Sequence, residues 1–210
     1  MQRREAYGTS GTRPVLRLFG GWDYPADLCE NPGLAARGYA GGVPMGGALR
    51  PPPPGAPAPT FVVAALRDPD PSAAPLQRLE IIKGWVEDGV SREAVLPLAS
   101  VAPGADVDLA TCQRRGSGAD RLCTVWTDPD FDPAEPAFYY ARVLENPSCR
   151  WSQWACVDAG VDCSEPDSIK EGFEPCCSER HRPTIRERAW SSPIWYTPAG
   201  AGPAGQAAGD

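Results

Sequence analysis

The sequence has a single histidine, His181, among its 210 residues. Histidine is the commonest metal ligand and general base, and a hydrolytic metal centre built from several histidines cannot be assembled from one. No GxSxG motif accompanies His181, so a Ser-His-Asp triad is not expected either. We therefore expect His181 to lie in an exposed loop, and we expect no catalytic residue in this chain.

Long apolar runs and basic runs are absent as well. The longest apolar runs, such as Phe61–Leu66, are far too short to cross a bilayer, so we expect no membrane span. Lys and Arg number 20 against 27 Asp and Glu, which gives a net charge of −7. Such a chain without a basic run repels phosphate backbones, so no nucleic-acid partner is expected. No apolar signal segment follows Met1, so the chain as given shows no export signal.

Proline and glycine, in contrast, are abundant, with 25 and 22 residues. This content argues against a helical bundle and favours short strands joined by long, turn-rich connections. Strand-like apolar patterns occupy residues 13–22, 60–68, 76–89, 91–100, 121–128, 137–146 and 188–198. We predict a mainly β protein, an antiparallel immunoglobulin-like β-sandwich with long Pro/Gly-rich and Cys-rich loops.

Some of these segments have a predicted place in the sheets. Segment 137–146 is largely apolar on both faces, which favours a central strand. Pro97 favours an edge position for segment 91–100, because proline cannot donate a ladder hydrogen bond. The Gly/Pro-rich stretch 24–59 is expected to be a spacer, with extended polyproline conformation at Pro51–Pro54.

The eight cysteines lie in loop-like sequence. Structural zinc sites usually pair ligands two to four residues apart, and no C-x2-C pair occurs. Disulfides and an oxidising compartment are therefore the better interpretation. We pair Cys112 with Cys123 across a predicted hairpin loop, expect Cys176 and Cys177 to reach different partners, and leave the other pairings open. The predicted disulfide cysteines are Cys29, Cys112, Cys123, Cys149, Cys156, Cys163, Cys176 and Cys177.

Several segments together carry a family resemblance. They are "REAYGTSGTRPVLRLFGGWDYP", "PTFVVAALRDP", "LQRLEIIKGWVEDG", "LCTVWTDPDFDPAEPAFYYARVLENPSCRWS" and "TIRERAWSSPIWYTP". This wording resembles the C-terminal region of a bacterial family of unknown function that is similar to the PHP (polymerase and histidinol phosphatase) metal-dependent hydrolases. Full-length members of that family begin with an exported, histidine-rich barrel carrying a "HVHTSYS"-like metal motif, and a β-sandwich follows the barrel.

The resemblance implies a domain organisation and a partner. Residues 1–13 would be the remnant of the barrel and the seam, 14–198 the sandwich with a cysteine-rich insertion at 149–180, and 199–210 a disordered tail. A divalent metal would be held by the missing barrel, and no cofactor by this chain. The barrel, or a separate chain that carries it, would be the partner. The parent family would be periplasmic or extracellular, whereas the location of this chain stays open.

Two short motifs are candidate binding sites. Thr9, Ser10 and Arg13 in "TSGTR" could hold an anion, because hydroxyls and a guanidinium suit phosphate or carboxylate; the alternative is a turn whose hydroxyls satisfy local backbone groups. The acidic loop "DPDFDPAE" suggests a weak calcium site, although Pro133 stands where the EF-hand pattern has glycine. Asx turns joining two strands are the preferred interpretation of that loop. Its carboxylates are Asp128, Asp130, Asp132 and Glu135.

Tryptophans in "WSQW" and "WSSPIWY" are candidates for an interface with the absent barrel, because a lost partner leaves an apolar patch exposed. Two functions follow from these patterns. The first is a non-catalytic accessory β-sandwich of a PHP-like hydrolase family, a truncated or split product of unknown substrate. The alternative is an independent extracytoplasmic module that binds calcium or carbohydrate.

Overall fold

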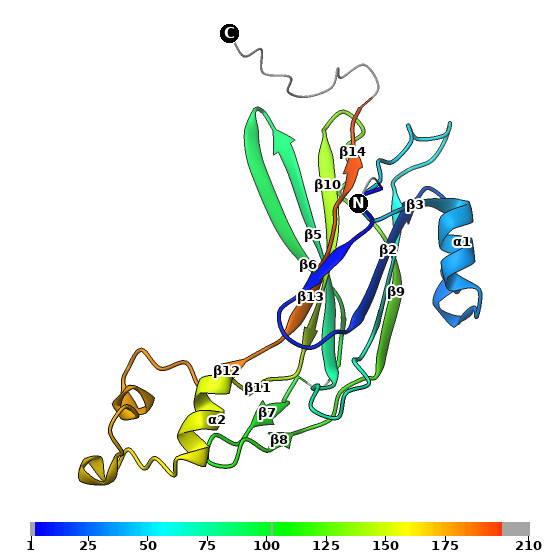
Figure 1. Cartoon of the computed structure of the whole chain (residues 1–210). Coiled ribbons are helices and arrows are strands. Elements are labelled where there is room, and N and C mark those ends of the chain that lie inside the picture. The colour runs from blue at the N-terminus through cyan, green and yellow to red at the C-terminus, as the bar shows by residue number, and fades with distance from the viewer. Residues whose placement is uncertain (1–2, 102, 199–210) are drawn as a thin grey trace.

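The computed structural model describes residues 3–101 and 103–198 (Figure 1). Its strands are β1 (Tyr7–Thr9), β2 (Val15–Gly21), β3 (Gly42–Pro44), β4 (Thr60–Leu66), β5 (Leu76–Glu87), β6 (Val90–Ser100), β7 (Asp106–Val107), β8 (Arg114–Arg115), β9 (Arg121–Thr127), β10 (Ala137–Glu145), β11 (Ser148–Cys149), β12 (Thr184–Ile185), β13 (Arg188–Ser191) and β14 (Ile194–Tyr196). Its helices are α1 (Leu34–Gly41) and α2 (Trp151–Asp158), with 3-10 turns η1 (Leu28–Glu30), η2 (Pro166–Ser168) and η3 (Glu174–Cys177). The tail predicted to be disordered, 199–210, lies outside the described residues.

Two antiparallel sheets pack face to face. The larger has the order β1-β13-β10-β5-β6, with β14 also pairing with β10, and the smaller has the order β3-β2-β4-β9. Side chains of both sheets alternate between core and outer face, as the pleat of a strand requires. Phe61 of the smaller sheet meets Tyr139 of the larger with ring centroids 4.4 Å apart, and both are fully buried. The predicted mainly β, antiparallel sandwich is therefore confirmed.

Strand β10 lies in the centre of the larger sheet, as its apolar faces predict. It pairs with β5 on one side and with β13 and β14 on the other. Residues Ser192 and Pro193 separate β13 from β14, so this side of the ladder is interrupted. The buried Ser191 side chain compensates, because its Oγ accepts a hydrogen bond of 3.0 Å from the backbone N–H of Ala141.

The edge of the larger sheet also follows the sequence. β5 and β6 form a hairpin whose two loop residues, Asp88 and Gly89, have φ values of 51° and 76°. Asp-Gly is a favoured sequence for such two-residue turns. β6 is the last strand of the sheet, and Pro97 sits opposite Glu80 where the pairing register shifts. The edge position that Pro97 predicts for this segment is therefore confirmed.

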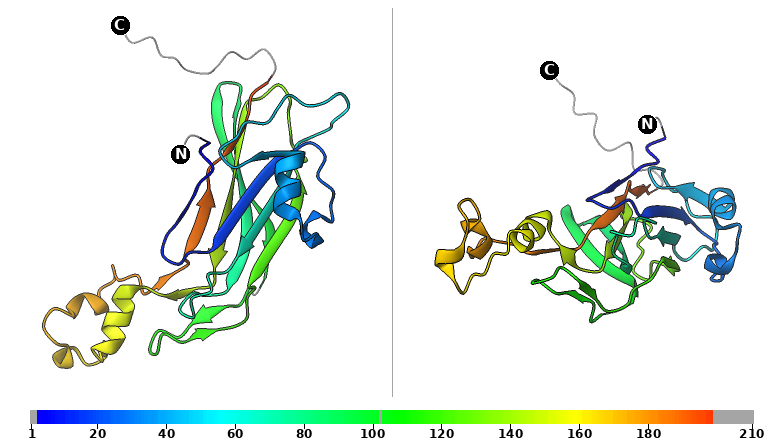
Figure 2. Two further views of the ribbon diagram at one scale, coloured as in Figure 1. Left: turned by 45° about the vertical axis from the view of Figure 1, so that its right-hand side comes forward. Right: turned by 60° about the horizontal axis from the view of Figure 1, so that its bottom comes forward.

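Two features differ from the sequence-based expectation. The stretch 24–59 is not only a spacer, because α1 lies within it and packs beside β2 and β3 (Figure 2). Gly38 makes this packing possible, since a Cβ there would lie 2.6 Å from the ring of Phe19. Strand β1 belongs to the larger sheet through its ladder with β13, so Tyr7–Thr9 lie on the sandwich side of the boundary predicted after residue 13.

The cysteine-rich insertion extends away from one end of the sandwich, opposite the end that carries α1 (Figures 1 and 2). It contains α2, which the sequence pattern did not predict, and the turns η2 and η3. In the part of the chain that the structure describes, neither helix has the length and apolar character to pass through a membrane.

Candidate functional site

All eight cysteines form disulfides, which confirms the prediction for each of them. The pairs are Cys29–Cys123, Cys112–Cys149, Cys156–Cys176 and Cys163–Cys177. Cys176 and Cys177 reach different partners, as expected. Four disulfides indicate an oxidising environment such as the periplasm or the extracellular space.

The pairing predicted between Cys112 and Cys123 is wrong. Cys112 lies in the connection between β7 and β8, which pair with each other and place it beside β11, where it bonds Cys149. Cys123 lies inside β9, beside η1, where it bonds Cys29. The two cysteines therefore belong to different ladders, and the segment between them is not one hairpin loop.

The "TSGTR" turn lies between the N-terminal segment and strands β10 and β13. The Ser10 hydroxyl donates to the carboxylate of Glu187 and accepts from the backbone N–H of Arg188 at 2.9 Å. The Thr12 hydroxyl donates to Glu145 Oε1 at 2.5 Å. Of the donors proposed for an anion, the Ser10 hydroxyl is thus occupied by the protein's own carboxylate, and the turn fastens β1 and β2 to the larger sheet.

The remaining members of the predicted anion site, Arg13 and Thr9, make backbone contacts. The backbone N–H of Arg13 donates to Asp68 Oδ2 at 2.6 Å, while Thr9 pairs with Ala189 in the β1–β13 ladder. Three carboxylates, those of Asp68, Glu145 and Glu187, surround the turn. Such a surrounding disfavours a second anion, so the geometry supports the structural alternative for this motif.

Glu145 is the most unusual of these carboxylates because only 1% of its surface is exposed. Burial raises the pKa of Glu145, and the charges of Glu187 and Asp68 raise it further. Hydrogen bonds from Thr12 and from the backbone N–H of Ala74, at 3.2 Å, act in the opposite direction. The "TSGTR" turn is therefore held by a buried acid whose protonated form the fold favours.

The acidic loop does not assemble into a calcium site. Asp128 is 1% exposed and turns into the core, where its Oδ2 lies 2.7 Å from Lys83 Nζ and accepts 2.7 Å hydrogen bonding from the Tyr139 hydroxyl. Asp132 accepts from the backbone N–H of Ala134 at 2.7 Å. Within residues 3–101 and 103–198, no group of three or more His, Cys, Asp or Glu is arranged to hold a metal ion.

The remaining carboxylates of the motif, Asp130 and Glu135, do not converge with Asp128. The backbone N–H of Asp130 donates to Asp128 Oδ1 at 3.0 Å, and its carbonyl accepts from Lys83 Nζ at 2.7 Å. The first contact is the local turn bond that the Asx-turn interpretation of this loop predicts, whereas the second reaches the loop from Lys83 of β5. The loop therefore closes a buried ion pair between β5 and β9.

His181 is half-buried rather than exposed. Its Nε2 lies 2.7 Å from Gln153 Oε1 on α2, and its backbone N–H donates to the carbonyl of Ser178 at 3.0 Å. The histidine thus ties the end of the insertion to α2. This contact joins two parts of the insertion.

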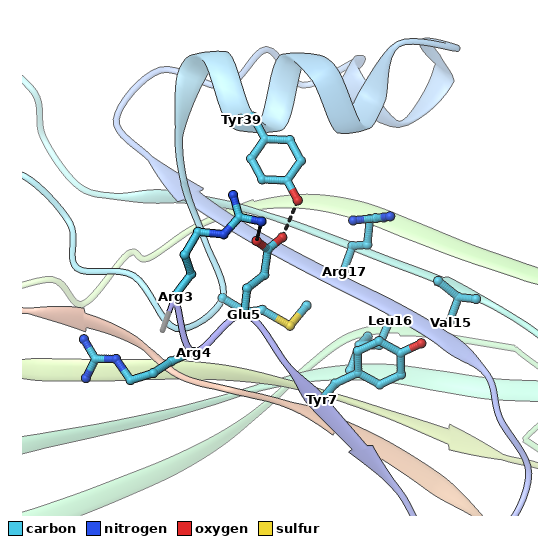
Figure 3. Close-up of a pocket in the computed structure, with 9 residues that line it drawn as sticks. Arg3, Arg4, Glu5, Tyr7, Val15, Leu16, Arg17 and Tyr39 are labelled. Atoms are coloured by element: carbon cyan, nitrogen blue, oxygen red, sulfur yellow. Dashed lines mark hydrogen bonds and ion pairs between the residues drawn. The ribbon is translucent and has the colours of Figure 1, made fainter. Parts of the chain in front are cut away.

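A cavity that the sequence did not reveal opens between the N-terminal segment, β2 and α1 (Figure 3). Its volume is about 870 Å³. Glu5 occupies its centre, 3.6 Å from the Arg3 guanidinium, and accepts a hydrogen bond from the Tyr39 hydroxyl. The described residues that line the cavity are Arg3, Arg4, Glu5, Tyr7, Val15, Leu16, Arg17, Tyr39 and Met45.

The electrostatics of this cavity are positive on balance. The hydrogen bond to Glu5 raises the pKa of Tyr39, whereas the nearby Arg17 guanidinium lowers it. Arg17 alternates with buried Leu16 and Leu18 along β2, which directs its side chain outward into the cavity. The site escaped sequence reasoning because one wall is α1, which lies in a stretch expected to be a spacer.

The comparisons with known proteins bear on the family and not on the chemistry. No curated protein and no solved structure is similar enough to this chain to count as a match. One family model, described as a protein of unknown function (DUF3604), matches residues 1–198. The match covers nearly the whole chain, so this protein belongs to the DUF3604 family.

Proposed function

We propose that this chain is a non-catalytic accessory β-sandwich that packs against the metal-binding barrel of a PHP-like hydrolase. The barrel is inferred from the resemblance of the sequence segments quoted above. The observation that carries the proposal is the cavity in Figure 3, because the chain enters the sandwich there. A domain that precedes the sandwich in full-length members would meet it at this surface.

The rim of this cavity has the composition of a protein interface. Tyr7, Val15 and Tyr39 are large side chains with 41%, 38% and 44% of their surface exposed. Aromatic residues, methionine and arginine are enriched at protein–protein interfaces, where the aromatic residues and arginine dominate the binding energy. Arg17 belongs to that set as well. Burial of this surface by a partner domain would remove apolar area from water.

The charge of the cavity also fits such a partner. Arg3, Arg4 and Arg17 outnumber the single acidic residue that lines it, Glu5. Complementary charge directs encounter between two surfaces, so this cavity would suit an acidic surface on the barrel. The N-terminal segment thus offers the barrel a positive, partly apolar seat.

The predicted tryptophan interface divides into two separate surfaces. Trp151, 83% exposed, and Trp154, 46% exposed, lie on α2 at the far end of the sandwich from α1 (Figure 1). Trp190 and Trp195 lie on the larger sheet and are 41% and 44% exposed. Since neither pair lines the cavity, we assign the barrel contact to the cavity and treat the tryptophans separately.

A binding experiment with purified proteins tests the proposal. The 210-residue chain is titrated with the separately expressed barrel of a full-length family member, and Arg17→Glu should weaken association by about tenfold. Arg180→Glu, at an exposed position of the insertion, is the matched control and should leave affinity unchanged. Thermal melts verify that both variants are folded.

Three results would overturn the proposal. The first is an equal loss of affinity in Arg17→Glu and Arg180→Glu, and the second is no association with the barrel at all. The third is hydrolysis of p-nitrophenyl phosphate by the 210-residue chain alone in the presence of manganese or zinc. The calcium alternative stays a prediction, and a rise of the melting temperature on addition of calcium would test it. The ion pair between Asp128 and Lys83 does not support it, because that carboxylate already has a cationic partner.

A further inference from the structure

Five arginines line a second cavity, of about 350 Å³, on the larger sheet beside the insertion. Arg78 lies in β5, Arg142 in β10 and Arg188 in β13, whereas Arg150 and Arg186 directly follow β11 and β12. None of the described residues that line this cavity is acidic. Its lining consists of Arg78, Arg142, Leu144, Pro147, Arg150, Thr184, Ile185, Arg186 and Arg188.

Strand register brings these arginines together. Leu144 of β10 lies opposite Arg188 of β13 and Arg78 of β5, so these three residues form one row across the sheet. The next row is Trp190, Arg142 and Glu80. The short β11–β12 ladder then places Arg150 and Arg186 beside the first row.

Both rows belong to the outer face, which we define as the side of the larger sheet that points away from the sandwich core. Along β10, Tyr139, Ala141 and Val143 are core residues. Because successive side chains of a strand alternate, Arg142 and Leu144 project to the other side. The outer face is therefore separate from the core between the two sheets, although Glu80 and Leu144 in these rows are themselves only 4% and 5% exposed.

One carboxylate serves this group of five cations. Glu80 lies 2.7 Å from Arg78 Nε and 2.6 Å from Arg142 Nη2. Among the described residues, no acidic side chain pairs with Arg150, Arg186 or Arg188. Arg150 Nε donates instead to the carbonyl of Thr184 at 3.1 Å, and Arg188 Nε to that of Arg186 at 3.3 Å. Mutual repulsion of such cations is relieved when an anion enters.

An aromatic strip continues along the same face. Tyr140 and Phe138 follow Arg142 at alternate positions of β10, and Trp195 of β14 lies opposite Phe138. The ring centroids of Phe138 and Trp195 are 5.3 Å apart, and those of Phe138 and Tyr140 are 6.5 Å apart and nearly parallel, at 12°. Gly84 of β5 leaves room for the Phe138 ring, because a Cβ there would lie 2.3 Å from it.

We propose that the outer face binds an anionic saccharide, with its sulfate or carboxylate groups in the arginine cavity and its sugar rings on the aromatic strip. Guanidinium groups recognise planar and tetrahedral anions through paired, charge-assisted hydrogen bonds. Aromatic faces bind apolar surfaces of flat ligands. From Arg142 to Phe138 the strand rises about 14 Å, enough for more than one sugar unit.

The observations favour a saccharide over a nucleic acid. Four disulfides indicate an oxidising compartment, where free nucleic acid is not the common polymer. A net charge of −7 and a sequence without a basic run oppose recognition of a phosphate backbone. This proposal does not depend on the presence of a hydrolase domain.

Isothermal titration of the 210-residue chain with four polymers tests the proposal. Dextran sulfate and polygalacturonate separate sulfate from carboxylate recognition, unsubstituted dextran reports neutral binding, and a thymidine oligonucleotide reports nucleic-acid binding. The Arg186→Gln/Arg188→Gln variant should weaken binding of the preferred anionic polymer by about tenfold or more. Trp195→Ala should weaken it by about threefold to tenfold.

The controls make the result specific. Arg37→Gln removes an exposed arginine from α1, outside the site, and should leave affinity unchanged. Glu80→Gln keeps the shape of the side chain but frees Arg78 and Arg142, so it should tighten binding several-fold. Arg186→Gln alone, at an exposed position, keeps the test decisive if the double variant does not fold.

Four outcomes would overturn the proposal. They are no binding of either anionic polymer, equal binding of dextran, tighter binding of the oligonucleotide than of both anionic saccharides, and an unchanged affinity in a folded Arg186→Gln/Arg188→Gln variant. Binding of either anionic polymer with the expected loss in the arginine variants supports it and identifies the preferred group.

Discussion

The sandwich and the cysteine-rich insertion are stabilised in different ways. The sandwich buries a continuous apolar core from both sheets, including Leu18, Phe61 and Ile81. In the insertion, α2 buries only Cys156, and η2 and η3 bury no residue. Disulfides hold the insertion together where apolar contacts are too few, which is the usual solution for small cross-linked folds. The sandwich is therefore stabilised mainly by its apolar core, and the insertion mainly by its disulfides.

The polar contacts of the two regions differ in the same sense. In the sandwich, Lys83 of β5 and Asp128, which directly follows β9, meet in the core at 2.7 Å. In the insertion, Asp162 accepts from the backbone N–H and the hydroxyl of Ser164, two residues away, at 2.8 and 2.7 Å. Those local bonds lower the pKa of Asp162. Long-range pairs therefore join the sheets, whereas short-range turns shape the insertion.

The largest effect is expected from Asp128→Ala in the sandwich. The substitution leaves the ammonium of Lys83, 8% exposed, without its carboxylate and the Tyr139 hydroxyl without an acceptor. Breaking a buried ion pair in this way costs about 3–5 kcal/mol of unfolding free energy. Urea unfolding at neutral pH measures it. Asp132→Ala in the same loop should cost about 1 kcal/mol or less, and equal losses would contradict the special role of Asp128.

A smaller and more local effect is expected from Cys156→Ser/Cys176→Ser. The bridge spans 20 residues, and its loss should destabilise the insertion by about 3 kcal/mol in the chain-entropy model. Amide hydrogen exchange should rise between residues 151 and 180 and stay unchanged in β5 and β10. Cys29→Ser/Cys123→Ser is the contrasting variant, because it should loosen the sandwich. Faster exchange in β10 of the first variant would refute the division by region.

The smallest effect is expected from Glu145→Gln, which alters the buried acid beneath the "TSGTR" turn. The pKa of Glu145 is raised above its ordinary value of 4.5, so the fold favours the protonated acid. The contribution of Glu145 to the free energy of unfolding is therefore fully present below that value and is lost as pH rises through the raised pKa. The glutamine variant should be more stable than the parent at neutral pH, by on the order of 1 kcal/mol, and lose that advantage near pH 4.

Melting temperatures of the parent and of Glu145→Gln, measured across this pH range, provide the test. Glu135→Gln is the control, because Glu135 lies in the surface loop that joins β9 to β10. Its melting temperature should follow that of the parent at every pH. A difference between Glu145→Gln and the parent that does not vary with pH would show that ionisation of Glu145 has no part in stability.

Local patterns in the sequence predicted most of the sandwich. Apolar segments predicted the long strands, the two apolar faces of 137–146 predicted the centre of the sheet, and Pro97 predicted an edge. The helices were not predicted, because α1 and α2 are eight residues each and have little apolar periodicity. The Cys112–Cys123 pairing was wrong for a related reason, since a disulfide depends on which strands become neighbours.

The amino-acid sequence by itself determined the composition of the fold: strands from apolar alternation, turns from Asp-Gly and proline, and cross-links from the eight cysteines. The positions of the charged side chains, in contrast, depend on the tertiary structure. Asp128 is one of four carboxylates in a loop, yet strand packing turns it inward onto Lys83. Arginines 78, 142, 150, 186 and 188 are scattered along the chain, and the register of β5, β10 and β13 places them around one cavity. Pairing between distant strands sets these positions, and no local pattern encodes it.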